Sequence, residues 1–298
     1  LHFTIHSFPT RRSSDLGRIL DDLPLDEEFN WVDRVSIELT TQMLATLFDF
    51  PFEERRWLTY WSDVATSSPQ LTGSDSITEE ARQEELKRCL AYFNELWNER
   101  SENPGNDFVS MMTQSEAFRD MEPLEYLGNL ILLIVGGNDT TRNTMTGSVY
   151  ALNKYPEQYA KLSADPSLIP NMVAEIIRWQ TPLSHMRRRA LEDVELGGKT
   201  IRAGDKVVMW YLSGNRDESA FDRPDDLIID RDNARSHVSF GYGIHRCMGN
   251  RLAEMQLRVT WEEIMKRFRF VEVTGEPERV RSNFVHGYSN LPVRLHAR

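Results

Sequence analysis

A cysteine framed by glycines stands in the run Phe240-Gly241-Tyr242-Gly243-Ile244-His245-Arg246-Cys247-Met248-Gly249. Glycines remove side chains where a backbone must turn sharply or pass close to a flat group. Backbone N–H groups of such a loop, and the N-terminus of the helix expected after it, stabilise a negative charge on the cysteine sulfur. The run therefore has the composition of a loop that presents a thiolate.

Three interpretations of this run differ in their chemistry. A thiolate that binds haem iron is one of the few roles that need this arrangement. The simplest alternative is a glycine-rich turn around a buried structural cysteine. A phosphate loop is the third, but the run lacks the third glycine of a dinucleotide fingerprint, and no Gly-Lys-Ser/Thr follows. We favour the first interpretation, with Cys247 as the metal ligand.

The composition is that of a globular protein. The chain has 298 residues, 40% apolar and 27% charged, which suffices for one large domain or two small ones. Its net charge of −11 gives no electrostatic support for binding nucleic acid. Two cysteines imply no disulfide framework and fit a cytoplasmic, reducing location. Cys89 lies among apolar residues at helical spacing and is predicted to be buried, and neither cysteine has neighbours at zinc-ligand spacing.

The pattern of the chain predicts mainly α-structure with small β-sheets. The longest apolar run, Leu130 to Val135, is far too short to span a membrane. Residues 1–16 show no periodicity that continues, and we set them aside as a non-native or disordered leader before a domain over residues 17–298. Helices are expected over residues 29–48, 52–61, 123–154, 169–179 and 248–268, and one that ends near Arg100. Strands are expected over residues 194–196, 199–201 and 206–211, and short strands and turns over 270–296.

The helix expected from Pro123 to Lys154 contains a sequence that disfavours helix at its centre. Gly136-Gly137-Asn138-Asp139-Thr140 includes two glycines, each unfavourable by roughly 1 kcal/mol. A carboxylate beside a hydroxyl could act as a proton relay, and the glycines would let a flat group approach the helix. The alternative is a kink tolerated for packing.

Further charged residues are candidates for roles in a haem-thiolate protein. Glu175 and Arg178 are three apart on one helical face, where the alternative is a solvated surface ion pair. Arg188 and His245 are candidates for binding the carboxylates of a cofactor, because arginine makes forked contacts to such groups.

Together and in this order, the three motifs resemble the cytochrome P-450 superfamily of haem-thiolate monooxygenases. These motifs are Gly-Gly-Asn-Asp-Thr at 136–140, Glu-Ile-Ile-Arg at 175–178, and the cysteine loop. His245 stands at the position where the bacterial soluble branch of this superfamily often has histidine, which is a further resemblance to that branch. More narrowly, residues 33–41, 127–143, 241–257 and 280–285 are similar to the bacterial alkane terminal hydroxylases.

The resemblance implies roles for individual residues. Cys247 would be the axial ligand of haem b, iron protoporphyrin IX, and Asp139 and Thr140 would deliver protons for O–O cleavage. Glu175 and Arg178 would brace the chain with a third group from residues 215–231. Many relatives have an arginine where this chain has Asp226, so Arg231 or another residue must serve. The resemblance also implies a set of haem contacts: Arg188, His245, Phe240, Gly243, Gly249, Gly136 and Gly137. The residues that would line the substrate channel are Leu130, Leu133, Ile134, Leu183, Ser184 and residues 284–288, which include Phe284.

The activity implied is insertion of one oxygen atom of O₂ into a terminal C–H bond of a medium-chain alkane or fatty acid. Electrons would come from NAD(P)H through ferredoxin reductase and ferredoxin. Two alternatives remain open: a haem-thiolate enzyme of peroxygenase or dehydratase type, and an inactive fragment. Members of the family are longer at the N-terminus, so we expect the chain as given to bind haem weakly or to be unstable.

Overall fold

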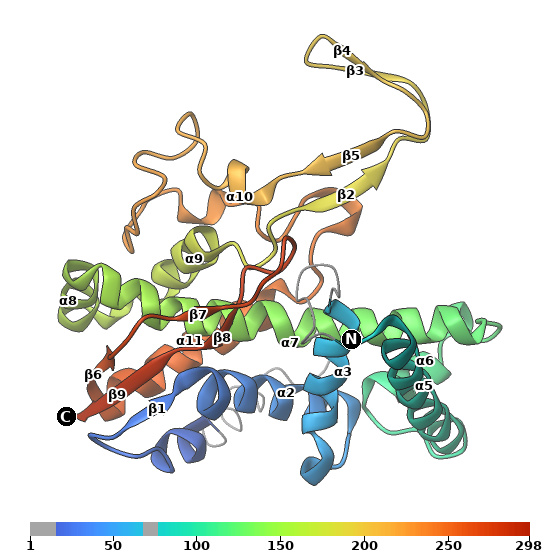
Figure 1. Cartoon of the computed structure of the whole chain (residues 1–298), viewed down its shortest axis with the longest axis horizontal. Coiled ribbons are helices and arrows are strands. Elements are labelled where there is room, and N and C mark those ends of the chain that lie inside the picture. Colours follow the sequence, from blue (N-terminus) through green and yellow to red (C-terminus); the bar gives the residue numbers. More distant parts are fainter. Residues whose placement is uncertain (1–15, 68–76) are drawn as a thin grey trace.

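One long helix, α7 (Pro123–Lys154), runs through the middle of the molecule, and the other elements are arranged around it (Figure 1). The computed structural model describes residues 16–67 and 77–298. Pro123 occupies the first turn of α7, where its fixed φ is favourable, and Pro156 follows directly after the helix ends. These bounds confirm the prediction. Residues 1–15 of the predicted leader lie outside the described residues.

The chain before α7 is helical except for one short strand. The prediction of a continuous helix over residues 29–48 was wrong at its start, because Phe29 pairs with Val293 in a sheet. After residues 16–21, which are helical, the elements are β1 (Glu28–Asn30), the π-helical η1 (Val32–Ile37), α2 (Glu38–Phe48), η2 (Phe52–Glu54), α3 (Arg56–Thr66), α5 (Glu79–Glu102), α6 (Phe108–Thr113) and η4 (Glu116–Phe118).

The helices after α7 are shorter. They are α8 (Pro156–Ala164), η5 (Pro166–Leu168), α9 (Ile169–Gln180), α10 (Tyr211–Gly214), η6 (Ala234–Ser236), η7 (Gly243–His245) and α11 (Asn250–Arg267). Helices α9 and α11 confirm two predicted helices to within two residues at each end. Trp261 of α11 donates a hydrogen bond to the Ser148 hydroxyl of α7 (2.8 Å), so α11 is anchored to the central helix.

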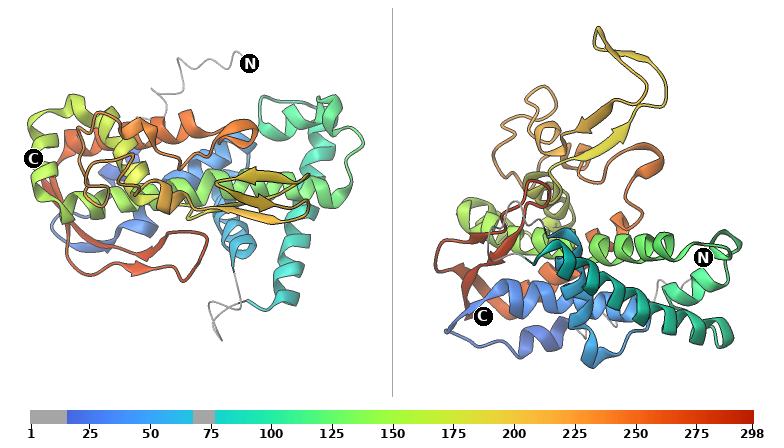
Figure 2. Two further views of the ribbon diagram at one scale, coloured as in Figure 1. Left: turned by 90° about the horizontal axis from the view of Figure 1, so that it is seen from above. Right: turned by 45° about the vertical axis from the view of Figure 1, so that its right-hand side comes forward.

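Within the described ranges 16–67 and 77–298, all strands pair antiparallel, in four small sheets. One has three strands in the order β1-β9-β6, with β9 (Pro292–Ala297) between β1 and β6 (Phe268–Val273). The others are β2 (Met186–Arg189) with β5 (Lys206–Met209), β3 (Val194–Leu196) with β4 (Lys199–Ile201), and β7 (Glu278–Arg279) with β8 (Tyr288–Asn290). Strand β2 was not predicted. Figures 1 and 2 show the β2–β5 ribbon and the β3–β4 hairpin projecting away from the helices.

Two hydrophobic cores lie along α7. One gathers Trp31, Leu152 and Trp261 with the three-stranded sheet, and it includes Leu16, the last residue of the segment that we set aside. The other gathers Phe48 and Phe93 with Leu130 and Ile134 of α7. The prediction that Leu130 and Ile134 line a substrate channel was therefore wrong, because both are fully buried among helices α2, α3 and α5.

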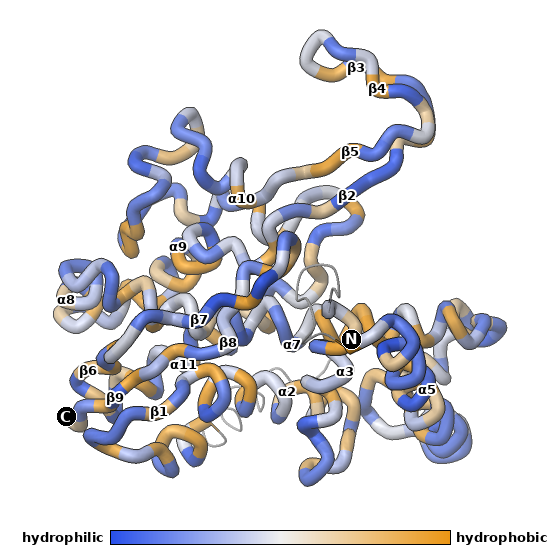
Figure 3. Tube along the Cα trace, in the orientation of Figure 1, coloured by the Kyte–Doolittle hydropathy of each residue, from blue (hydrophilic) through white to orange (hydrophobic). Residues whose placement is uncertain are grey.

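The surface elements are mostly polar. Helix α5 buries only Cys89, Phe93 and Leu96, and Figure 3 shows it as largely hydrophilic. The predicted burial of Cys89 is confirmed, and burial raises the pKa of its thiol to about 12. Within residues 16–67 and 77–298, no helix combines the length and apolar character needed to span a membrane.

Candidate functional site

The cysteine loop has the backbone that its glycines suggested. Gly241 and Gly243 have φ of 66° and 76°, in the left-handed region that favours glycine. A Cβ at position 241 would also lie 3.0 Å from the Tyr211 hydroxyl. The Cys247 N–H donates to the Phe240 carbonyl (2.8 Å), which closes the loop directly before α11. The loop is therefore fixed at both ends, with the cysteine just ahead of a helix N-terminus. 

The Cys247 thiol is accessible from outside the loop. Tyr242, Ile244 and Met248 of the same loop are large and exposed, so the loop presents apolar side chains on its surface. Desolvation raises the pKa of the thiol, while the Gly249 N–H and the charge of Arg246 act in the opposite direction. A bound metal cation would outweigh that desolvation and leave the sulfur as a thiolate.

The pair Glu175–Arg178 is fully buried, which excludes a solvated surface pair. Arg178 makes two parallel bonds to the carboxylate, of 2.7 Å from Nε and 2.8 Å from NH2. Arg231 is the third member: its Nε lies 3.1 Å from both Glu175 oxygens. One buried carboxylate thus receives two guanidinium groups, which is the arrangement in which a buried charge is tolerated.

Both arginines also bind main-chain carbonyl groups of the segment that leads to the cysteine loop. Arg178 donates to the carbonyls of Asn215 (2.7 Å), Pro224 (2.6 Å) and Asp226 (2.9 Å). Arg231 also donates to the Asp226 carbonyl (3.3 Å). Asp226 therefore contributes its backbone to this network. The network holds residues 215–231 against α9.

The two central glycines of α7 have different surroundings. Gly136 is exposed, and a Cβ built there would meet no atom within 4 Å. At Gly137 the same Cβ would lie 2.7 Å from Cδ2 of Leu44 in α2. Gly136 therefore leaves space beside α7, whereas Gly137 permits close packing of α7 on α2. The Thr140 hydroxyl bonds the Gly136 carbonyl (3.2 Å), one turn back along the helix.

Asp139 is buried and faces α3. Its carboxylate accepts hydrogen bonds from Ser62 (3.1 Å) and Thr66 (3.3 Å) and pairs with Arg142 one turn along α7 (3.0 Å). Desolvation raises the pKa of Asp139 despite the opposing effect of Arg142. Arg142 also contacts Asp63 (2.5 Å), whose side chain is 51% exposed. These contacts connect a carboxyl with a high proton affinity to the molecular surface.

The two segments predicted to line the substrate channel lie side by side. Leu183 forms a β-bridge with Val285, and the Ser184 N–H donates to the Phe284 carbonyl (2.9 Å). Leu133 of α7 is partly buried and packs against the second core. The structure thus brings Leu183 and Phe284 together, while Leu133 packs beside the apolar residues of α2, α3 and α5.

Two buried amides that the sequence analysis missed hold these segments. Asn143 donates to the Asp139 carbonyl (2.8 Å) and accepts from the Tyr288 N–H (2.9 Å). Gln180 donates to the His286 carbonyl (2.7 Å) and accepts from the Tyr288 hydroxyl (3.0 Å). Isolated amides carry no periodic signal, so the sequence offered no means of finding them.

Arg188 and His245 come from separate elements. Arg188 lies in β2, with its guanidinium on the Arg187 carbonyl (3.0 Å), and His245 ends η7 and is exposed. Neither forms an ion pair with another described residue. Figure 1 and the right-hand view of Figure 2 both show the segment leading into α11 between the β2–β5 ribbon and α7.

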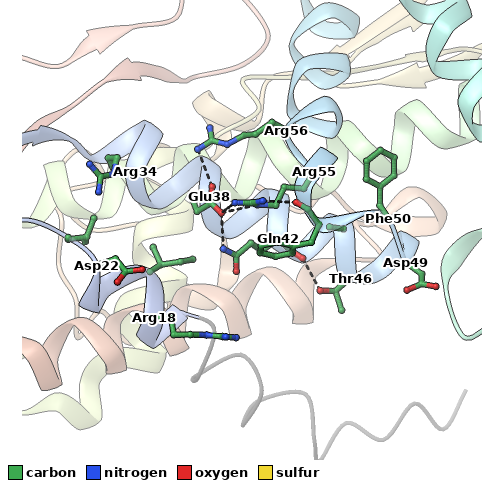
Figure 4. Close-up of a pocket in the computed structure, with 14 residues that line it drawn as sticks. Arg18, Asp22, Arg34, Glu38, Gln42, Thr46, Asp49, Phe50, Arg55 and Arg56 are labelled. Carbon is green, nitrogen blue, oxygen red and sulfur yellow. Dashed lines mark hydrogen bonds and ion pairs between the residues drawn. The ribbon is translucent and has the colours of Figure 1, made fainter.

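A cavity elsewhere in the molecule contains none of the predicted site residues. It has a volume of about 800 Å³ and is lined by residues of α2, the start of α3 and residues 18–23. Figure 4 shows Arg55 and Arg56 directed at Glu38. Two of its arginines, Arg55 and Arg56, are therefore already compensated by a carboxylate.

Comparisons with known proteins show the family of this chain. The model of the family "Cytochrome P450" matches residues 26–288. Linalool 8-monooxygenase of Pseudomonas putida is 37% identical over 282 residues, which cover 93% of this chain and 68% of that protein. Methyl-branched lipid omega-hydroxylase of Mycobacterium tuberculosis (strain ATCC 25618 / H37Rv) is 35% identical, covering 90% of this chain and 63% of that protein. The solved structure of cytochrome P450-153 from Novosphingobium aromaticivorans is 52% identical, with a TM-score of 0.89, over 98% of this chain and 71% of that one.

Proposed function

The chain belongs to the cytochrome P450 family, and from that premise we propose that its protein hydroxylates the terminal carbon of a medium-chain alkane or fatty acid. Similarity to a protein named as a lipid omega-hydroxylase supports a chain-end substrate. Electrons would come from NAD(P)H through ferredoxin reductase and ferredoxin. Exposed arginines beside the thiol, Arg246 and Arg251, offer charge that suits an acidic electron donor.

The residues present fit a haem. Cys247 is exposed on a loop that also exposes Tyr242, Ile244 and Met248, and at Gly136 an added Cβ would meet no atom within 4 Å, which leaves space beside α7. Among the described residues, no group of three or more His, Cys, Asp or Glu side chains could hold a metal ion. Cys247 would therefore be the sole protein ligand, with Arg188 and His245 available for the propionates. When bound, a thiolate-ligated haem supplies the electron density that favours O–O cleavage.

The single observation that carries the oxygenase assignment is the buried Asp139 with its raised pKa beside Thr140. The raised pKa favours the protonated form of this carboxyl, which is the form that can donate a proton, and the contacts through Arg142 to the half-exposed Asp63 link the carboxyl to the molecular surface. The Thr140 hydroxyl donates to the Gly136 carbonyl, so its oxygen is left as an acceptor. Asp139 would store the proton and Thr140 would orient it.

The test supplies the haem-loaded enzyme with ferredoxin, its reductase and NAD(P)H, and identifies the products of octane and of a medium-chain fatty acid. We expect the terminal alcohol to dominate. Hydroxylation confined to internal carbons would reject the chain-end assignment and leave the family intact.

Replacement of Thr140 by Ala separates oxygenase chemistry from the peroxygenase or dehydratase alternative. We expect product formation per NAD(P)H consumed to fall by about 10²-fold, with the electrons recovered as hydrogen peroxide, because proton delivery is lost. Product and peroxide are measured together. Unchanged turnover in this variant would favour the alternative chemistry.

A further inference from the structure

A buried amide connects the cysteine loop to the helix that carries Glu175 and Arg178. Asn215 follows α10 directly and has no exposed surface. Its Nδ2 donates to the hydroxyls of Ser239 (2.7 Å) and Thr181 (2.8 Å). Its Oδ1 accepts from the Val238 N–H (2.8 Å). One side chain thus bonds both to the end of α9 and to the two residues that precede Phe240.

The direction of these bonds is fixed by the hydroxyl groups. Ser239 donates its only hydroxyl proton to the Ile177 carbonyl (2.9 Å), and Thr181 donates its own to the Arg178 carbonyl (2.6 Å). Each hydroxyl oxygen can therefore only accept from position 215. A side chain there must supply two donors and one acceptor, which is what a primary amide supplies.

The main chain of Asn215 belongs to the same connection. Its carbonyl accepts from Arg178 (2.7 Å), and its N–H donates to the Tyr211 carbonyl (2.9 Å). Beyond Val238, the Gly241 N–H donates to the Val238 carbonyl and the Cys247 N–H to the Phe240 carbonyl, both at 2.8 Å. A continuous path of hydrogen bonds therefore leads from the buried Glu175–Arg178 pair through Asn215 to Cys247.

We propose that Asn215 is a positioning residue that holds the loop in the conformation from which Cys247 binds haem iron as a thiolate. The proposal rests on the haem-thiolate assignment above but does not depend on the substrate. A buried network whose members are all satisfied favours one conformation, because each alternative leaves a polar group without a partner. Loss of the amide should release the loop while leaving the helices folded.

The test compares two substitutions of the same kind. Asn215→Leu removes all three side-chain bonds at nearly constant volume. Asn153→Leu is the matched control: Asn153 also makes three such bonds, to the carbonyls of Val149 and Val271 and from the Val273 N–H, each 2.9 Å long. It joins α7 to β6 and makes no contact with the cysteine loop. Both variants should lower Tm, so that Tm alone does not distinguish them.

Two measurements separate the variants. In amide hydrogen exchange of the haem-free chain, Asn215→Leu should raise the exchange rate of residues 238–247 by about tenfold. In the reduced, carbon monoxide-treated enzyme, Asn215→Leu should convert much of the thiolate-type spectrum to the type given by a neutral thiol. Asn153→Leu should change neither. If Asn215→Leu keeps the exchange and the spectrum of the control, the proposal is overturned.

Two further outcomes are also decisive. If Asn215→Leu does not fold, Ser239→Ala takes its place, since it removes both the bond from the Asn215 amide and the bond to the Ile177 carbonyl and should still raise exchange over residues 238–247. Unchanged exchange in Ser239→Ala then overturns the proposal. If the wild-type enzyme shows no thiolate spectrum, the proposed function fails, and the exchange comparison still decides whether Asn215 orders the loop.

Discussion

The surroundings of Asp139 disfavour the ionised form of its carboxyl. It is 1% exposed, and desolvation raises the pKa of its carboxyl even with Arg142 at 3.0 Å. Such a pKa is the property expected of a group that holds a proton for use in a reaction. The structural consequence is that the folded protein binds a proton here more tightly than the unfolded chain does. Stability is therefore lost at this site as pH rises.

Replacement of Asp139 by Asn should remove this pH dependence. Because the folded-state pKa is raised, the wild-type carboxyl stabilises the fold least above that pKa, where it is ionised. The Tm of Asp139→Asn relative to wild type should accordingly increase as pH rises. Thermal unfolding followed across neutral and acidic pH measures this difference. A difference that grows toward low pH would contradict the raised pKa.

At the scale of elements, α7 shows how a single helix serves several neighbours. Gly137 packs against Leu44 of α2, and Gly147 leaves room for the Gln180 side chain at the end of α9. Asn138 accepts from Thr40 (2.8 Å), and Thr146 meets Ser36 (2.9 Å). The residues that disfavour helix locally are the ones that let other helices approach, so tertiary contacts offset their low propensity.

Substitution of Gly147 by Ala should destabilise the protein by about 1–3 kcal/mol, because the new Cβ would collide with the Gln180 carboxamide. Gly128→Ala in the same helix is the control. Gly128 is exposed and has no atom within 4 Å of an added Cβ, so Ala there should stabilise by about 0.5–1 kcal/mol. Denaturant titration of both variants gives the two free energies of unfolding. Equal changes in the free energy of unfolding for Gly147→Ala and Gly128→Ala would show that the Gln180 side chain does not depend on the missing Cβ at position 147.

The elements that could be predicted are those with strong local signals. The bounds of α7 were predictable because Pro123 and Pro156 punctuate the helix. Strand β2 was missed because Met186 to Arg189 contains no apolar alternation, although Arg188 is half-buried in it. Leu130 and Ile134 were assigned to the substrate channel from the resemblance, which cannot say which neighbours cover them in this chain.

The candidate site was predictable to the same degree. Cys247 and the pair Glu175–Arg178 belong to recognisable motifs, whereas the partners that position them do not. Arg231 was one of several candidates for the third group, and the structure selects it. Asn215 was missed because its partners, a guanidinium, two hydroxyls and a main-chain N–H, are brought together only by folding.

At the scale of the whole molecule, distant parts of the chain are joined at two places. β1 near the start and β6 pair with β9 at the C-terminus. The network of Glu175, Arg178 and Arg231 holds residues 215–231 on α9 and, through Asn215, holds the cysteine loop. The β2–β5 ribbon and α7 lie on opposite sides of the segment that leads into α11 (Figure 1). The thiol is thus presented by tertiary contacts and is not fixed by its loop alone.

Replacement of Arg231 by Met should cost about 3–5 kcal/mol, because it breaks a buried ion pair and leaves several carbonyls without donors. Arg223→Met is the control in the same segment. The Arg223 side chain is 63% exposed and lies 3.6 Å from each of two carboxylates, so its loss should change stability by less than about 1 kcal/mol. Denaturant unfolding compares the two variants, and similar losses would argue against the network as the main anchor.

The central claim is that Cys247 binds haem iron as a thiolate. Its most direct test is the absorption spectrum of the haem-loaded protein, reduced and exposed to carbon monoxide. We predict the thiolate-type spectrum in the wild type and its loss in Cys247→Ser, with Cys89→Ser unchanged because Cys89 is buried in the second core. A wild type without that spectrum, or a Cys247→Ser variant that retains it, would contradict the account.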